Sequence, residues 1–245
     1  MPSSADAELL RSLQADIRAL VVRDLTAFFA SIDLERPEAA RDALLEYVPF
    51  LVATYGEQAA SMAADWYDDV RAAESIGGRF RAAMTVPDES EAAEGLVRRA
   101  AGALFTDAPL AALPMIQGKA AMYAIEGARQ TVMTATTRDP RSSGWKRITR
   151  AGACRFCRML AGRGAVYKES TVHFAAHGGA EGGECNCAAV PSWDPDAPEV
   201  DVFLYEASAR MSGLRRAAGN GDKGAQRQID EHNARIRNYM ESLDD

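Results

Sequence analysis

Apolar residues recur every three to five positions along the first part of the chain. From about Ala7 to Ile32 they are Leu10, Leu13, Ile17, Leu20, Leu25, Phe28 and Ile32. This spacing places them on one face of an α-helix, and Ser4 is available to cap its first turn. The pattern therefore predicts an amphipathic helix over this range.

A second helical stretch begins at Pro37, because proline favours the first turn of a helix. Pro49 and Gly56 interrupt this stretch, since proline removes a backbone N–H and glycine is a poor helix former. We therefore expect a kink or a break before the helix continues from Glu57 to Glu74.

Alanine-rich helical composition returns over about Glu89–Phe105 and Ala111–Thr136. Before these stretches, the glycines and proline of residues 76–88 indicate a short irregular connection. Pro109 and Pro114 mark the expected turn between the two helices. Apolar residues still recur on their faces, so the alanine content indicates close helix packing.

The composition changes at Arg138–Gly144, a polar and turn-forming stretch that suits a domain boundary. We predict a helical domain at residues 1–137, a cysteine and histidine module at 138–198 and C-terminal helices at 199–245. Within the module, Pro191–Pro198 is expected to run extended over the surface. The C-terminal helices are expected at about Val200–Ala218 and Lys223–Leu243. The predicted fold class is mainly α.

The composition of the 245 residues is ordinary for a globular protein, with 47% hydrophobic residues. No run of about 18 consecutive apolar residues occurs, and the first residues have neither a basic start nor an apolar stretch. Secretion and membrane spanning are therefore not expected. These features predict an intracellular protein.

The charge is unevenly distributed along a chain whose net charge is −7. Basic residues, with no acidic one among them, occupy Arg141, Lys146, Arg147, Arg150, Arg155, Arg158, Arg163 and Lys168. This stretch fits a solvated face, compensation for the negative charge of zinc thiolates, or a patch that contacts phosphate or an acidic protein. The residues leave these three interpretations open.

All the cysteines fall within a short part of the chain, at Cys154, Cys157, Cys185 and Cys187. A Cys-x-x-Cys turn lets two thiolates reach one tetrahedral ion, and a second pair completes such a site. Both cysteines of the second pair are candidates, or one of them is a bystander and His177 supplies the fourth ligand. The clustering therefore predicts one structural zinc site.

Other interpretations of these residues are weaker. His173 has nothing to distinguish it from a packing histidine, and His232 lies in a charged helical stretch far from the cysteines. Disulfides would need an oxidising compartment, for which the sequence gives no signal. A catalytic zinc needs an open position and a general base, and no His-Glu-x-x-His or comparable motif occurs. No catalytic residue is assigned.

One run of motifs contains Trp145, then Gly152-Ala-Cys-Arg-Phe-Cys-Arg-Met-Leu-Ala-Gly-Arg-Gly-Ala-Val-Tyr167, Phe174-x-x-His177, Cys185-x-Cys187 and Pro191. This stretch from Trp145 to Pro191 resembles the cysteine module of the phage Mu F-like minor head proteins. It is closest to the actinobacteriophage versions, which are often labelled capsid maturation proteases. A glycine-rich insertion after His177 departs from the family spacing.

The resemblance implies a minor component of the phage head, placed at or near the portal. We therefore expect a structural assembly protein whose helical part docks on the portal or major capsid protein. The rival functions are the protease implied by the family label and a zinc module that binds packaged DNA through residues 141–168. Few histidines remain for a catalytic triad if those beside the cysteines bind metal.

Overall fold

The computed structural model describes residues 2, 4–148, 161, 188–194, 214, 218 and 223–241. Its elements are α1 (Ser4–Ser31), α2 (Pro37–Ala73), α3 (Ser90–Ala100), the 3-10 turns η1 (Ala101–Phe105) and η2 (Pro109–Ala111), α4 (Ala112–Ala124), α5 (Glu126–Arg138), β1 (Gly144–Ile148), β2 (Ala188–Ser192) and α8 (Lys223–Glu241). The described part of the chain is mainly α-helical, as predicted. Among these helices, none has the length and hydropathy needed to cross a membrane.

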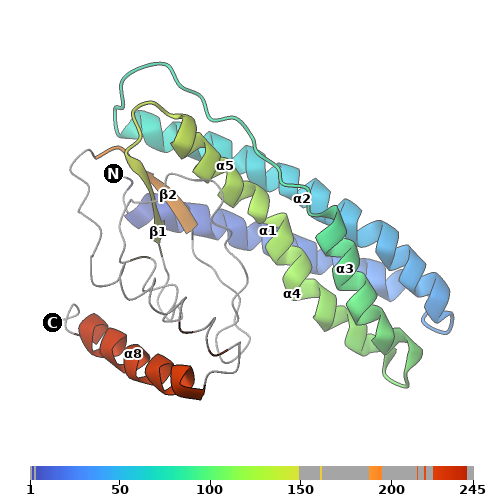
Figure 1. The fold of residues 1–245 in the computed structure, drawn as a ribbon. Coiled ribbons are helices and arrows are strands. Elements are labelled where there is room, and N and C mark those ends of the chain that lie inside the picture. Colours follow the sequence, from blue (N-terminus) through green and yellow to red (C-terminus); the bar gives the residue numbers. More distant parts are fainter. Residues whose placement is uncertain are drawn as a thin grey trace.

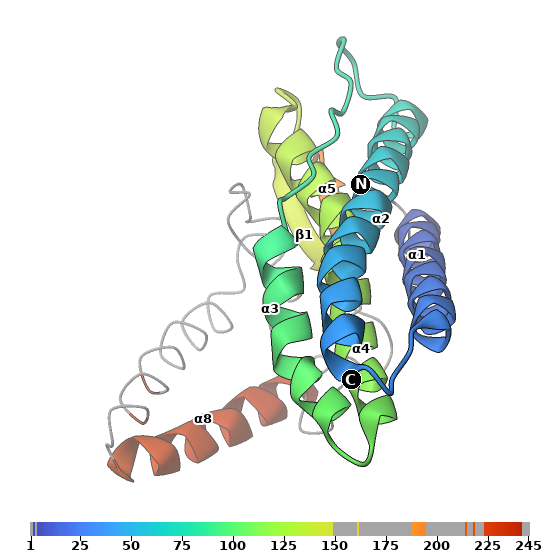
Figure 2. The same ribbon diagram turned by 90° about the vertical axis from the view of Figure 1, so that its right-hand side faces the viewer.

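The long helix α2 is the centre of a helical bundle. It contacts α1, α3, α4 and α5, and α1 also packs against α4. Figure 1 shows α4 and α5 nearly end to end, running along the α1–α2 hairpin, and Figure 2 shows α3 on the side of α2 away from α1. The bundle thus covers α2 on several sides.

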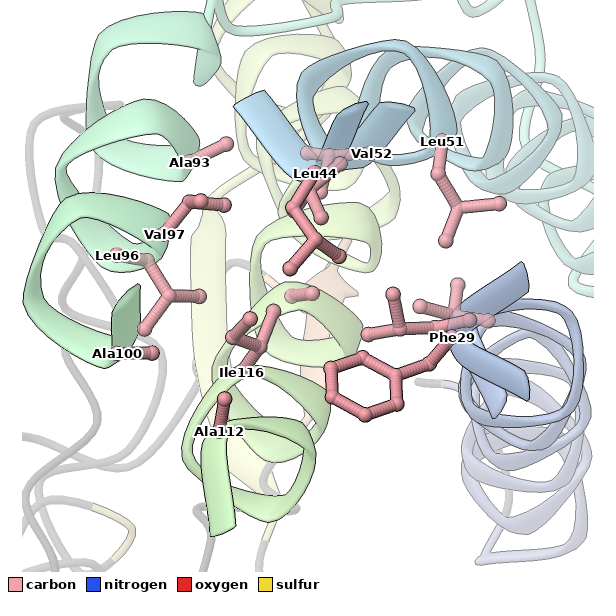
Figure 3. Packing of buried hydrophobic residues seen from close by; sticks show 14 of the residues in the cluster. Phe29, Leu44, Leu51, Val52, Ala93, Leu96, Val97, Ala100, Ala112 and Ile116 are labelled. Carbon is pink, nitrogen blue, oxygen red and sulfur yellow. The ribbon is translucent and has the colours of Figure 1, made fainter. Parts of the chain in front are cut away.

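Two apolar clusters fill the bundle. One lies where α1, α2, α3 and α4 meet, and Figure 3 shows side chains such as Phe29, Leu44, Val97 and Ile116 pointing toward one another. The other lies between α1, α2, α5 and the strand pair and includes Trp145. Of the apolar face predicted for the first helix, these clusters bury Leu10 and Leu25, while its other residues are partly exposed.

A kink or a break was expected in the second helix, and the break is wrong, because α2 continues from Pro37 to Ala73 through Pro49 and Gly56. The kink stays a prediction. Packing along its length outweighs the local cost of a proline, which is about 3 kcal/mol in a helix interior. Gly56 serves close packing: a Cβ placed on Gly127 of α5 would lie only 2.3 Å from the Gly56 carbonyl oxygen. The two glycines let α2 and α5 approach backbone to backbone.

The helices predicted over about 7–32, 89–105 and 223–243 are confirmed with changes at their ends. The helix expected to end at Phe105 becomes a 3-10 turn after Ala100, and the long helix expected over Ala111–Thr136 divides at Ile125 into α4 and α5. Pro114 lies within the first turn of α4, where its missing N–H costs no helical hydrogen bond, and not in the connecting turn. The helix expected over 200–218 lies outside the described residues except for positions 214 and 218.

The antiparallel pair β1–β2 is part of the bundle core. Trp145 and Val190 are fully buried within the same cluster as Ala59 and Val132 of the helices. The prediction that Pro191 begins a stretch running over the surface is wrong, because Pro191 pairs with Trp145 and is buried. A proline is tolerated there because in a two-stranded sheet each strand has an unpaired edge. The predicted boundaries at 137 and 198 stay a prediction, although strand residues beyond the first boundary share the helical core.

Candidate functional site

The strand pair holds together the two ends of the segment that carries the cysteines. Ile148, the last residue of β1, is the Cα partner of Ala188, the first residue of β2. Cys187 directly precedes Ala188, and Cys154 follows Ile148 by six positions. Six residues of extended chain span about 20 Å at most, so the chain length between the strand pair and these cysteines allows the first and last cysteines to meet.

The predicted ligands themselves lie outside the described residues. This holds for Cys154, Cys157, His177, Cys185 and Cys187, and also for the weaker candidate His173. The described residues contain no group of three or more His, Cys, Asp or Glu side chains able to hold a metal ion. The zinc site therefore stays a prediction. The structure describes the residues that flank the cysteine segment and the contacts that hold them.

A buried carboxylate, Asp139, is the centre of this framework. It follows the last residue of α5, and its side chain is fully buried. Its Oδ2 atom accepts hydrogen bonds from Arg71 Nε at 2.8 Å, from Trp193 Nε1 at 2.9 Å and from the Tyr67 hydroxyl at 3.2 Å. Its Oδ1 atom accepts one from the backbone N–H of Arg141 at 3.0 Å. We call this set of residues the Asp139 network.

Arg71 extends the network to the turn that follows α2. Its terminal nitrogens donate to the carbonyl oxygens of Ile76, Gly77 and Gly78 at 3.1, 3.0 and 3.3 Å. Gly78 has φ +91°, a conformation that suits glycine. The guanidinium thus satisfies carbonyl groups that would otherwise need water, and it fixes the path of the chain as it leaves α2.

The Asp139 network is electrostatically balanced. Burial by itself raises the pKa of the Asp139 carboxyl, but the hydrogen bonds from Arg71 and Trp193 and the charge of Arg71 outweigh burial and hold the pKa below its usual value. Burial, reinforced by the negative charge of Asp139, raises the pKa of the Tyr67 hydroxyl. The carboxylate is therefore ionised and saturated with donors, an arrangement that holds structure and is unsuited to accepting a proton from a substrate.

A second set of contacts pins the strand pair to the end of α5. The Ser192 carbonyl oxygen accepts hydrogen bonds from the Ser143 N–H at 2.8 Å and from the hydroxyls of Ser143 and Ser142 at 3.0 and 3.2 Å. Gly144, with φ +144°, starts β1 directly after this turn. Together with Trp193 bound to Asp139, these contacts fix the far end of β2.

The sequence interpretation missed this framework. The polar stretch from Arg138 to Gly144, predicted as a domain boundary, connects α5 to β1 and makes part-buried hydrogen bonds that the sequence did not indicate. The sequence feature that could have indicated these contacts is Asp139 directly after a predicted helix, followed within a few residues by two serines, since such side chains often bond to nearby backbone groups. Its partners Arg71 and Trp193 are 68 and 54 positions away, and no local pattern identifies them.

The basic stretch is only partly described. Arg141 is exposed, Lys146 is half-buried with its pKa lowered by burial, and Arg147 is 2% exposed. Arg147 is therefore in the interior and does not belong to an exposed basic face. Arg150, Arg155, Arg158, Arg163 and Lys168 lie outside the described residues.

Fold and framework together define a mainly α protein in which a helical bundle and a buried strand pair hold both ends of a cysteine-bearing segment. The sequence model of the VG15 protein family matches residues 1–208. The chain therefore belongs to the VG15 family, a family of phage proteins. No curated protein and no solved structure shows significant similarity to it.

Proposed function

We propose that this protein is a structural minor capsid protein of a tailed bacteriophage, which acts in head assembly at or near the portal and carries one structural zinc ion. Membership of the VG15 family supports the phage context. The resemblance of residues 145–191 to the Mu F-like cysteine module supports the finer assignment. The observation that carries the zinc site is the pairing of Ile148 with Ala188, which holds both ends of the cysteine segment together.

In this proposal, Cys154 and Cys157 hold the zinc ion with two of His177, Cys185 and Cys187. Thiolate and imidazole donors suit tetrahedral zinc, and a closed site of four protein ligands is structural. The intervening segment is rich in glycine and has little apolar content, so metal binding would offset its ordering entropy. Because the strand pair already holds the two ends together, less of that entropy remains for the metal to offset.

The helical bundle would provide the docking surface on portal or major capsid protein. Its long α1–α2 hairpin is held rigidly by two apolar clusters and by the Asp139 network. The protein would then be in the host cytoplasm during assembly and in the phage head afterwards. Basic residues between 141 and 168, apart from the buried Arg147, would provide a contact to packaged DNA or to an acidic protein.

The zinc ion is tested by measuring metal in the purified full-length protein. We expect about one zinc per chain, and we expect Cys157→Ser to lose it. His177→Gln and the matched control His173→Gln separate the two histidines, and Cys185→Ser and Cys187→Ser separate the last cysteine pair. A folded wild-type protein that contains no zinc and binds none when it is added would refute the site.

The head assignment is tested separately, by mass spectrometry of purified phage particles and of portal-containing procapsids. We expect the protein in the procapsid at low copy number relative to the coat protein. Detection only in the infected cell, with none in either particle, would refute the assignment whatever the metal content.

Two alternative functions make different predictions. A capsid maturation protease would cleave coat subunits, and cleavage that persists in a folded, metal-free protein would favour that function over the structural one. A nucleic-acid-binding zinc module would bind DNA with an affinity that falls steeply as salt rises. The family resemblance supports the protease, and the basic stretch supports the DNA-binding module. The hydrogen-bonded framework around Asp139 favours a structural role.

A further inference from the structure

A groove runs between the first half of α1 and the last half of α2. Its lining includes Asp6, Leu9 and Leu13 of α1 and Met62, Asp65, Trp66, Asp69, Val70 and Ala73 of α2. Both sets follow three- and four-residue steps, so each helix contributes one face. The groove has a volume of about 460 Å³. Its lining contains no residue of the strand pair or of the Asp139 network, and none of the predicted zinc ligands.

The floor of the groove is apolar and rigid. Trp66 and Val70 are each 4% exposed, and the Trp66 Nε1 atom donates a 3.0 Å hydrogen bond to the Asp6 carbonyl oxygen. That bond ties the two helices together under the groove. Above the floor, Leu9 is 53% exposed, so a large apolar side chain remains open to contact at the edge.

The rim of the groove is acidic. Asp6, Asp65 and Asp69 are among its lining residues, and no lysine or arginine is. Asp65 and Asp69 lie one helical turn apart, where like charges repel, and neither makes an ion pair with any described residue. Their neighbour Asp68, in contrast, is paired with Arg81 at 3.1 Å.

We propose that this groove binds an amphipathic helix of a partner protein, with apolar residues on the face that enters the groove and lysine or arginine along its flanks. A channel between two helices with an apolar floor is the shape that receives the apolar face of a third helix. The carboxylates of Asp65 and Asp69 would gain cationic partners, which would offset their mutual repulsion. Leu9 and Leu13 would pack against the apolar face of the incoming helix, close to Trp66.

The test uses the full-length protein and a labelled synthetic peptide of about five helical turns, built from leucine on one face and lysine on the other. A second peptide with glutamate in place of every lysine is the charge control. Fluorescence anisotropy measures the binding of each. We expect the lysine peptide to bind and the glutamate peptide to bind at least about tenfold more weakly.

Two variants address the groove. Leu9→Ser removes the exposed apolar contact, and the double variant Asp65→Lys/Asp69→Lys reverses the rim charge. We expect each to weaken binding of the lysine peptide by about tenfold or more. All the substituted side chains are exposed, so folding should be preserved and can be verified by thermal unfolding.

Each variant has a matched control elsewhere on the bundle. Leu110→Ser changes a leucine that is 67% exposed outside the groove, and Glu38→Lys/Asp42→Lys reverses an exposed acidic pair of the same spacing near the start of α2. Binding should be unchanged in both. Equal weakening by the controls, or no binding of the lysine peptide to wild-type protein, would overturn the proposal.

A second copy of the chain is the competing occupant, because its own residues 141–168 are basic. A concentration-dependent dimer that Asp65→Lys/Asp69→Lys abolishes would overturn the partner-helix proposal in favour of self-association. Repeating the peptide titration with Cys157→Ser separates this inference from the zinc site, since groove binding should persist when the metal is lost.

Discussion

Trp193 and Arg71 donate hydrogen bonds to the same carboxylate oxygen, Asp139 Oδ2, at 2.9 and 2.8 Å. Trp193 follows the last strand residue, and Arg71 lies in the last turn of α2. One buried atom therefore connects the exit of the cysteine segment to the central helix of the bundle. A substitution at Asp139 should therefore weaken the contacts of both Trp193 and Arg71.

Asp139→Asn should destabilise the protein strongly. The substitution removes the negative charge and leaves the Arg71 guanidinium buried without its counter-charge, which typically costs about 3–5 kcal/mol. The free energy of unfolding from urea titration measures the effect. Asp42→Asn removes an exposed carboxylate paired with Arg41 and should cost less than about 1 kcal/mol. Similar losses in the two variants would show that the Asp139 network contributes no more than a surface ion pair.

The contribution of Asp139 should disappear in acid. Its folded-state pKa is held below the usual value, so the stabilisation is fully present above the unfolded-state pKa of about 3.9 and is lost as pH falls from there through the folded-state pKa. The difference in unfolding free energy between wild type and Asp139→Asn should therefore shrink below about pH 4. A difference that stays constant or grows in this range would contradict the assigned charge state.

Gly127→Ala should destabilise the bundle although alanine favours helices. The added Cβ would lie 2.3 Å from the Gly56 carbonyl oxygen, and backbone cannot move aside cheaply, so a cost of about 1–3 kcal/mol is expected. Gly95→Ala in α3 is the matched control, because its nearest contact is the end of the Arg99 side chain at 3.6 Å. That variant should gain about 0.5–1 kcal/mol. Thermal unfolding of both proteins compares them, and stabilisation by Gly127→Ala would disprove the close approach of α2 and α5.

Trp145→Ala should cost about 3–5 kcal/mol, since the side chain is fully buried between the strand pair and the helices. Phe105→Ala removes another large aromatic side chain that is 50% exposed and should cost about 1 kcal/mol or less. Chemical denaturation followed by circular dichroism at a helical wavelength distinguishes them. If the helical signal of Trp145→Ala unfolds as in wild type, the strand pair is not part of the bundle core.

The helices were predictable because their apolar faces repeat within one or two turns. Leu10 and Leu25, spaced along one face of α1, are fully buried as the pattern indicates. The prediction at Gly56 was wrong because a local pattern reflects only the poor helix propensity of glycine. It contains no information about Gly127 of α5, whose backbone lies against that of Gly56. Tertiary packing decided that position.

The framework of the candidate site was less predictable for the same reason. The spacing of Cys154 and Cys157 identifies them as candidate metal ligands from the sequence alone. The structural role of Asp139 depends on Arg71 and Trp193, which are more than 50 positions away. Trp145 entered the sequence analysis only through a family resemblance, and Pro191 also as the start of a stretch expected at the surface. Their pairing in a buried sheet is a property of the fold that no short window of sequence contains.

The register of the strand pair has a consequence for how the chain can vary. Because Ile148 and Ala188 are Cα partners at the open end of an antiparallel pair, a two-residue turn such as Asn-Gly could join them directly as a hairpin. Residues 149–187 are thus an insert between two chain ends that contacts in the described part of the fold anchor. Family members could therefore differ in the length and sequence of this insert while keeping the same helical bundle.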